Sequence, residues 1–171
     1  MDTGALWHRA VAAIGEEERS RFEIDRHQRN LRWLLDGMAA IGNERDAPIR
    51  VAYSFVGDRW SSLILHLLSG GSLRHGELRR LIEIVSAEHE ISQRQLTLKL
   101  RVLEREGFVS RVVTPGPVHR VDYAMTELGA EFYEHLAALT RWLQQSNASI
   151  LQARQRYLAH ADEETAGVAD E

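Results

Sequence analysis

Residues 91–125 read ISQRQLTLKLRVLEREGFVSRVVTPGPVHRVDYAM. The first part repeats leucine at helical spacing and stops at Gly107, a residue typical of helix ends. The remainder is rich in β-branched and aromatic residues and is interrupted by Pro115-Gly116-Pro117-Val118. The stretch therefore predicts an amphipathic helix followed directly by a β-hairpin. The buried stripe of that helix consists of Leu96, Leu100 and Leu103.

The helix begins at Ser92, because serine at the cap with Gln95 three residues later forms a capping box that satisfies two backbone N–H groups. Its outward side chains suit the major groove of DNA, where arginine contacts guanine, glutamine contacts adenine and an apolar group meets the thymine methyl. A solvated amphipathic helix with no partner is the alternative. The candidate recognition residues are Ser92, Gln93, Arg94, Gln95, Thr97, Leu98 and Arg101.

The hairpin favours the DNA interpretation, since it follows the candidate recognition helix and carries basic residues near its tip. A two-stranded ribbon is marginal in water by itself, and such a wing can contact phosphates or the minor groove. An ordinary surface hairpin is the alternative. The candidate contacts on the wing and its flank are Arg74, Arg111, His119 and Arg120.

Periodicity outside this stretch predicts further helices over about 6–14, 17–41, 51–68 and 75–84, and a long one capped by Thr126. The expected fold is mainly α with a small β-hairpin wing, a winged helix-turn-helix with extra N-terminal helices and a long C-terminal dimerisation helix. The expected domains are an N-terminal helical extension at 1–47, a DNA-binding domain at 48–126, the dimerisation helix at 127–158 and an acidic disordered tail at 159–171.

The net charge of −4 argues at first against nucleic acid as a partner. The charge is unevenly distributed, however. Residues 74–120 carry nine basic and six acidic side chains, whereas residues 159–171 carry five acidic ones and no Lys or Arg. The proposed DNA-binding segment is therefore basic.

Several protein classes are excluded or disfavoured by what the sequence lacks. With no cysteine there is no disulfide scaffold, thiolate metal site or thiol redox sensor. No histidine pair has the spacing of a metal motif, and no nucleophile elbow or phosphate-binding glycine loop occurs, so we expect no metal, no cofactor and no enzymatic activity. His66 is expected to be a hydrogen-bonded histidine. The sequence has no signal-peptide pattern and no long apolar run, which predicts a cytoplasmic protein.

Residues of about 51–143 resemble the HxlR-type winged-helix transcriptional regulators of bacteria. The matching motifs in order are Gly57-Asp58-Arg59-Trp60, Leu63-Ile64-Leu65, Gly70, Leu73-Arg74, Glu77-Leu78, Ile91-Ser92, Leu96-Thr97, Leu100, Leu103-Glu104, Gly107-Phe108-Val109, Arg111, Pro117, Val121-Asp122-Tyr123, Met125-Thr126, Gly129 and Trp142.

This resemblance implies a homodimeric DNA-binding regulator, more often a repressor, that binds a palindromic site. The sequence departs from the family in four respects. His75 replaces the usual aromatic residue, the connection 83–90 is longer, the sensing cysteine of many members is absent, and the N-terminal block is extra. Candidate dimer residues on the C-terminal helix are Phe132, Leu136, Leu139, Trp142 and Leu143.

Two questions stay open at the level of sequence. Trp7, Trp33 and the helix at 51–68 can together line a pocket for a small apolar or aromatic effector, or the N-terminal helices can merely extend the dimer interface. The helix at 92–106 can bind DNA, or it can bind an acidic protein in an interaction module that does not bind DNA.

Overall fold

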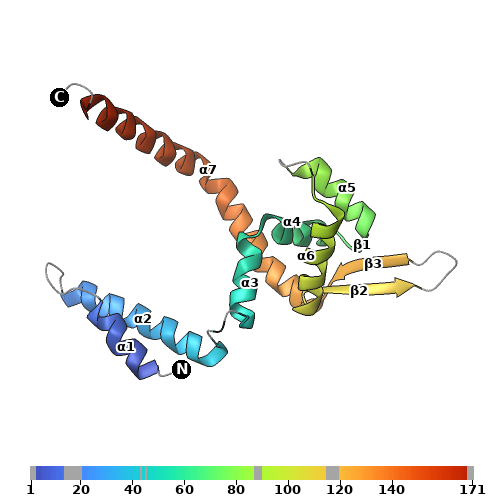
Figure 1. Cartoon of the computed structure of the whole chain (residues 1–171), viewed down its shortest axis with the longest axis horizontal. Coiled ribbons are helices and arrows are strands. Elements are labelled where there is room, and N and C mark those ends of the chain that lie inside the picture. Colours follow the sequence, from blue (N-terminus) through green and yellow to red (C-terminus); the bar gives the residue numbers. More distant parts are fainter. Residues whose placement is uncertain are drawn as a thin grey trace. The chain divides into compact units, whose positions relative to one another are not determined.

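The computed structural model describes residues 3–13, 21–42, 44, 46–86, 90–114 and 120–168 (Figure 1). The chain divides into two compact units, Met1–Asp58 and Arg59–Glu171. This division falls after the start of the predicted DNA-binding domain at residue 48, so the helix over 48–57 lies in the first unit.

The first unit consists of α1 (Thr3–Ala12), α2 (Arg21–Ile41) and α3 (Pro48–Gly57). α1 packs against α2, and the Arg32 guanidinium lies 4.3 Å from the centre of the Trp7 ring. α1 and α2 match the two predicted N-terminal helices, although residues 14–20 lie outside the described residues.

The predicted single helix over 51–68 is wrong. The structure has α3 and then α4 (Arg59–Leu68), separated by Asp58 in an extended conformation with φ −89° and ψ 114°. Pro48 is at the start of α3, where its missing N–H leaves no helical bond unmade. Apolar residues keep helical spacing on both sides of Asp58, so periodicity alone does not reveal the break.

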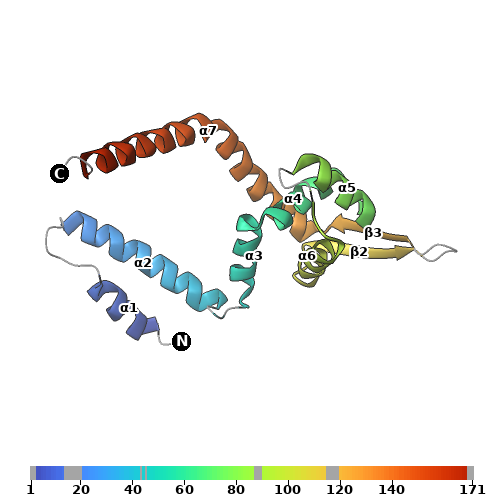
Figure 2. The same cartoon turned by 45° about the horizontal axis from the view of Figure 1, so that its top comes forward.

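The second unit begins with α4 and continues with β1 (Leu73–Arg74), α5 (His75–Val85), α6 (Gln93–Arg105), β2 (Val109–Thr114), β3 (Arg120–Met125) and α7 (Glu127–Val168). The strands form an antiparallel sheet in the order β1-β3-β2, with Leu73 opposite Tyr123 and Val109 opposite Met125. β2 and β3 project away from the helices as a wing (Figure 2). The predicted helices at 75–84 and 92–106 and the predicted hairpin are confirmed. The two-residue strand β1 was not predicted.

The hydrophobic core of the second unit lies between α4, α5, α6 and the sheet. The leucine stripe predicted for α6 is buried, and α4 packs against α5, α6, α7 and β3. Burial of these side chains is the main stabilising term, at about 25 cal/mol per Å² of apolar surface. The buried hydrophobic residues of α4, α5 and α6 are Trp60, Ile64, Leu65, Leu68, Leu78, Ile82, Leu96, Leu100 and Leu103, joined by Phe108, Val109, Tyr123 and Leu136.

The ends of the wing are joined by a short network of hydrogen bonds. Thr126 Oγ1 donates to the Gly107 carbonyl at 2.6 Å and accepts from the Gly129 N–H at 2.9 Å, while the Thr126 N–H donates to the Phe108 carbonyl at 3.1 Å. Thr126 thus caps α7, as predicted, and also ties it to the end of α6. Gly107 has φ +80°, the left-handed conformation that favours glycine at a helix end.

α7 is longer than predicted. The helix continues past residue 158 and through the predicted disordered tail as far as Val168. Alanine and glutamate in this segment are good helix formers, whereas the sequence prediction relied on its acidic side chains, which suggested disorder. Residues 169–171 of the predicted tail lie outside the described residues.

The Gly129→Ala variant tests the contact between α7 and the wing. A Cβ at Gly129 would lie 2.0 Å from the Phe108 carbonyl oxygen, so backbone must shift. We expect a loss of about 3 kcal/mol in the free energy of unfolding, measured with urea. The matched control is Gly76→Ala on α5, where a Cβ meets no atom within 4 Å and should stabilise the helix slightly. Equal stability of G129A and wild type would contradict the close approach.

Candidate nucleic-acid interface

α6 starts as the sequence predicts. The Gln95 N–H donates to Ser92 Oγ at 3.1 Å, and the Ser92 N–H donates to Gln95 Oε1 at 3.3 Å, which completes the capping box. Ser92 and Gln95, two of the predicted recognition residues, therefore use their side chains to cap the helix. The capping bonds fix the first turn of α6, which carries the neighbouring polar residues.

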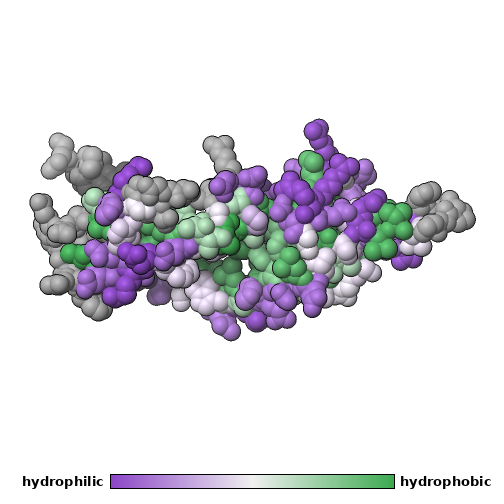
Figure 3. Space-filling view, turned by 90° about the horizontal axis from the view of Figure 1, so that it is seen from below, coloured by the Kyte–Doolittle hydropathy of each residue, from purple (hydrophilic) through white to green (hydrophobic). Residues whose placement is uncertain are grey.

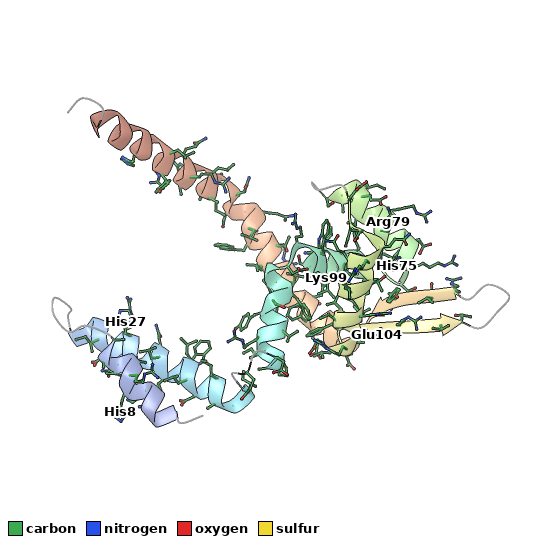
Figure 4. The ribbon with its side chains drawn as sticks, viewed as in Figure 1. His8, His27, His75, Arg79, Lys99 and Glu104 are labelled. Carbon is green, nitrogen blue, oxygen red and sulfur yellow. The ribbon has the colours of Figure 1, made fainter. Side chains whose placement is uncertain are left out.

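The outward face of α6 lies opposite its buried leucines. Gln93, Arg94 and Arg101 are exposed, and Leu98 is 49% exposed. These side chains combine an amide, two guanidinium groups and an apolar surface, which are the chemical groups that distinguish base pairs in the major groove. Figure 4 places Lys99 and Glu104 on the same helix.

Thr97 differs from these residues because its hydroxyl is used inside the protein. Thr97 Oγ1 donates to the Gln93 carbonyl at 2.8 Å, and His75 Nε2 lies 3.1 Å from the same oxygen. Since the hydroxyl has one hydrogen, the imidazole N–H is the donor in the second bond. Burial first and the charge of Arg79 second lower the pKa of His75, against a backbone hydrogen bond at Gln93 that raises it. His75 on α5 (Figure 4) therefore joins the two helices of the helix-turn-helix.

The wing presents two arginines in different states. Arg111 is exposed, whereas Arg120 Nε donates to Asp122 Oδ2 at 2.8 Å. This hydrogen bond raises the pKa of Arg120. Arg74 Nε also lies 3.8 Å from Asp122 Oδ1, so one carboxylate is shared by two of the predicted contacts. His119 lies outside the described residues.

The outer part of the wing is also apolar. Val112 and Val113 on β2 are exposed, and apolar side chains are visible on the hairpin beside the loop drawn in grey (Figure 3). The wing therefore offers a partner hydrophobic contacts as well as cationic groups.

Sequence reasoning missed three residues beside this surface. Asp122 pairs with Arg74 and Arg120, while Glu104 and Tyr123 line a cavity with Thr97, Arg101 and Arg111. Strand alternation could have placed Asp122 and Tyr123 on opposite faces of β3, but the sequence gives no sign of which arginines they approach.

The predicted dimer stripe on α7 divides into two parts. Leu136 is only 5% exposed, and Phe132 packs against Phe108 with ring centres 5.0 Å apart. These two belong to the core of the second unit. Leu139, Trp142 and Leu143 are exposed, with Trp142 at 57%. The part of the stripe that is available for a partner therefore starts at Leu139.

His66 on α4 is hydrogen-bonded, as expected. Thr140 Oγ1 donates to the Leu136 carbonyl at 2.9 Å and lies 3.1 Å from His66 Nε2. Nε2 is therefore the donor, and Nδ1 accepts from the Tyr133 hydroxyl at 3.3 Å. This neutral ring joins α4 to two turns of α7.

The first unit contains an apolar groove between α2 and α3. The groove has a volume of about 360 Å³, and its aromatic walls are Trp33, 74% exposed, and Tyr53, 68% exposed. Trp7 was predicted to share such a pocket, but it lines a separate space of about 150 Å³ with Arg32. The remaining lining residues of the groove are Leu34, Gly37, Met38, Ile41, Gly42, Ile49 and Arg50.

Among the described residues, no group of three His, Cys, Asp or Glu side chains could hold a metal ion. In the same residues no helix has the length and apolar character needed to cross a membrane.

Comparisons with known proteins agree with this geometry. A family described as HxlR-like helix-turn-helix matches residues 55–150. The HTH-type transcriptional regulator YtfH of Escherichia coli K12 is 34% identical over 107 residues, which cover 63% of this chain and 80% of that protein.

Two solved structures are similar as well. The structure of ytfH from Salmonella typhimurium has a TM-score of 0.55 and 31% identity, covering 66% of this chain and 95% of that one. The redox regulator HypR in its reduced form has a TM-score of 0.53 and 27% identity, covering 62% and 99%.

The recognition-type helix, the wing and these likenesses define a DNA-binding transcriptional regulator of the winged-helix class. Within that class, the chain belongs to the HxlR-like helix-turn-helix family.

The His66 contacts predict a pH dependence of stability. Burial lowers the pKa of His66 from its ordinary value of 6.5, so the unfolded chain binds more protons than the folded one just below that pH. Stability from this group is complete above pH 6.5 and is lost as the pH falls. We expect the free energy of unfolding of His66→Gln to decline less than that of wild type on acidification from neutral pH. His135→Gln, at an exposed position on α7, is the control, and an unchanged decline in H66Q would contradict the prediction.

Proposed function

We propose that the protein is a homodimeric repressor that binds a palindromic operator, with α6 in the major groove and the β2–β3 wing on the adjacent backbone. The observation that carries this proposal is the exposed row of Gln93, Arg94 and Leu98 on a helix whose opposite side is buried. The capped first turn gives these side chains a fixed backbone, which recognition of base edges requires.

The charge distribution supports this proposal. The chain has a net charge of −4, yet the segment that contains α5, α6 and the wing is basic. Because Asp122 neutralises part of the charge of Arg74 and Arg120, the basic surface is modest. Specific binding should then depend on two subunits that bind together, with weak affinity for unrelated DNA.

The exposed apolar stripe of α7 supports a dimer. Leu139, Trp142 and Leu143 lie on a helix of 42 residues, and their burial against a second copy would remove apolar surface from water. Two recognition helices that read a palindrome in successive major grooves are separated by about 34 Å, one turn of DNA.

Substitutions in α6 and the wing should have different effects on DNA binding. Arg94→Ala should cost about 1–3 kcal/mol on the operator and reduce sequence discrimination, because Arg94 is placed to contact bases. Arg120→Ala should weaken binding to all sequences alike, because a wing residue contacts the backbone. Fluorescence anisotropy on operator and scrambled duplexes measures both effects.

Arg154→Ala on the C-terminal part of α7 is the control variant, and it should bind like wild type. A salt series distinguishes DNA binding from the alternative of a protein-interaction module, since phosphate contacts make affinity fall steeply with salt. Wild-type protein that binds no duplex DNA, or variants R94A and R120A that bind as wild type does, would refute the proposed interface.

The groove of the first unit supports a second element of function, regulation by a small apolar or aromatic ligand. Trp33 and Tyr53 expose aromatic surface to a space of about 360 Å³, a size suited to one small molecule. HypR is described as a redox regulator, but this chain contains no cysteine, so a thiol cannot supply its signal.

A screen of aromatic compounds by thermal denaturation tests the ligand. A compound at one hundred times its Kd should stabilise the folded state by about 2.7 kcal/mol. Trp33→Ala should abolish that stabilisation, while Trp7→Ala, which alters the separate space beside Arg32, should retain it. The hypothesis fails if no compound changes the melting temperature or if W33A responds as wild type does.

A further inference from the structure

A polar cavity of about 420 Å³ lies between α6 and the wing. α6 contributes Thr97, Arg101 and Glu104, which recur at the spacing that places residues on one side of a helix. β2 contributes Arg111, and β3 contributes Tyr123 directly opposite it in the register of the sheet. The cavity therefore brings together one arginine from the recognition helix and one from the wing.

These two arginines differ from their neighbours in their partners. Arg105 pairs with Glu106 at 2.6 Å, and Arg120 pairs with Asp122 at 2.8 Å. Neither Arg101 nor Arg111 makes an ion pair within the described ranges of the chain, although both are exposed. Their guanidinium groups are available to an anion that enters the cavity.

We propose that Arg101 and Arg111 together bind one phosphate group of the DNA backbone in this cavity. The inference rests on the proposed function and specifies how the recognition helix and wing act as a unit. A guanidinium group is planar and donates two parallel hydrogen bonds to phosphate oxygens, and two such groups from different elements can hold one phosphate between them. Thr97 does not assist, because its hydroxyl proton is donated to Gln93.

The Glu104 carboxylate lines the same cavity and opposes an anion there. Removal of the Glu104 charge should therefore improve DNA binding, whereas removal of the charge of Arg101 or Arg111 should impair it. A surface that merely attracts DNA at long range would not distinguish Glu104 from other exposed carboxylates.

A phosphate shared by Arg101 and Arg111 would position the protein on the duplex. It carries no sequence information, but it sets the distance between α6 and the wing on the duplex and so fixes the register of the base contacts.

The test uses the full chain with Arg101→Gln, Arg111→Gln and the double variant, measured on operator and scrambled duplexes over a range of salt concentrations. Each single substitution should weaken binding to both duplexes about tenfold, because a charge-assisted hydrogen-bonding group is lost. The affinity of the double variant should fall by less than the product of the two single-variant factors. The slope of log affinity against log salt concentration should decrease in magnitude by about 0.9, the value for one phosphate, rather than by about 1.8.

Two further variants complete the design. Glu104→Gln should tighten binding to both duplexes, and Arg154→Gln, at an exposed position on the C-terminal part of α7, should bind as wild type does. Wild-type binding that depends on Arg94 but is unaffected by R101Q and R111Q would overturn this inference while the proposed function stands. A wild-type chain that does not bind DNA would overturn the proposed function itself.

Inorganic phosphate distinguishes DNA from a free anion as the source of the phosphate group. We expect millimolar phosphate to change the melting temperature of wild type and of the double variant by the same amount. A phosphate-dependent rise in wild type alone, with unchanged DNA affinity in the double variant, would identify a free-anion site and overturn the proposal. A fall of about 1.8 in the salt slope would show two separate phosphate contacts and would overturn it as well.

Discussion

The close approach of Gly129 to the Phe108 carbonyl is the constraint on which the second unit depends. No Cβ fits between these two backbones, and the three hydrogen bonds of Thr126 to Gly107, Phe108 and Gly129 hold them in contact. The end of α6, both ends of the wing and the start of α7 therefore meet at one point. A shift there would move the recognition helix, the wing and the long C-terminal helix together.

The electrostatics of the surface follow from local pairing more than from net charge. Asp122 lies close to two arginines from different strands, and Glu106 pairs with Arg105. The number of basic residues in the sequence is therefore larger than the number of cationic groups available to a partner. This distribution favours contacts that form only after a phosphate has arrived in the correct place, because screened surface charges attract DNA weakly over distance.

The elements that could be predicted from sequence are those whose causes are local. The capping box at Ser92, the leucine stripe of α6, Gly107 at the helix end and the hairpin each depend on a few adjacent residues. The break at Asp58 was missed because apolar spacing continues across it, and the length of α7 was missed because the acidic residues near its end suggested a disordered tail. The partners of Thr97, Asp122 and Leu136 depend on tertiary packing, which spacing along one helix or strand does not encode.

Thr97 shows how tertiary packing changes the chemistry that a residue presents. By type it is polar, and a threonine in a recognition helix is ordinarily counted as a hydrogen-bonding group. Here the oxygen is shared between the Gln93 carbonyl and the imidazole of His75. The group left for an outside partner is the methyl, so at this position α6 behaves as though it carried a small aliphatic side chain whose orientation is held by the preceding helix.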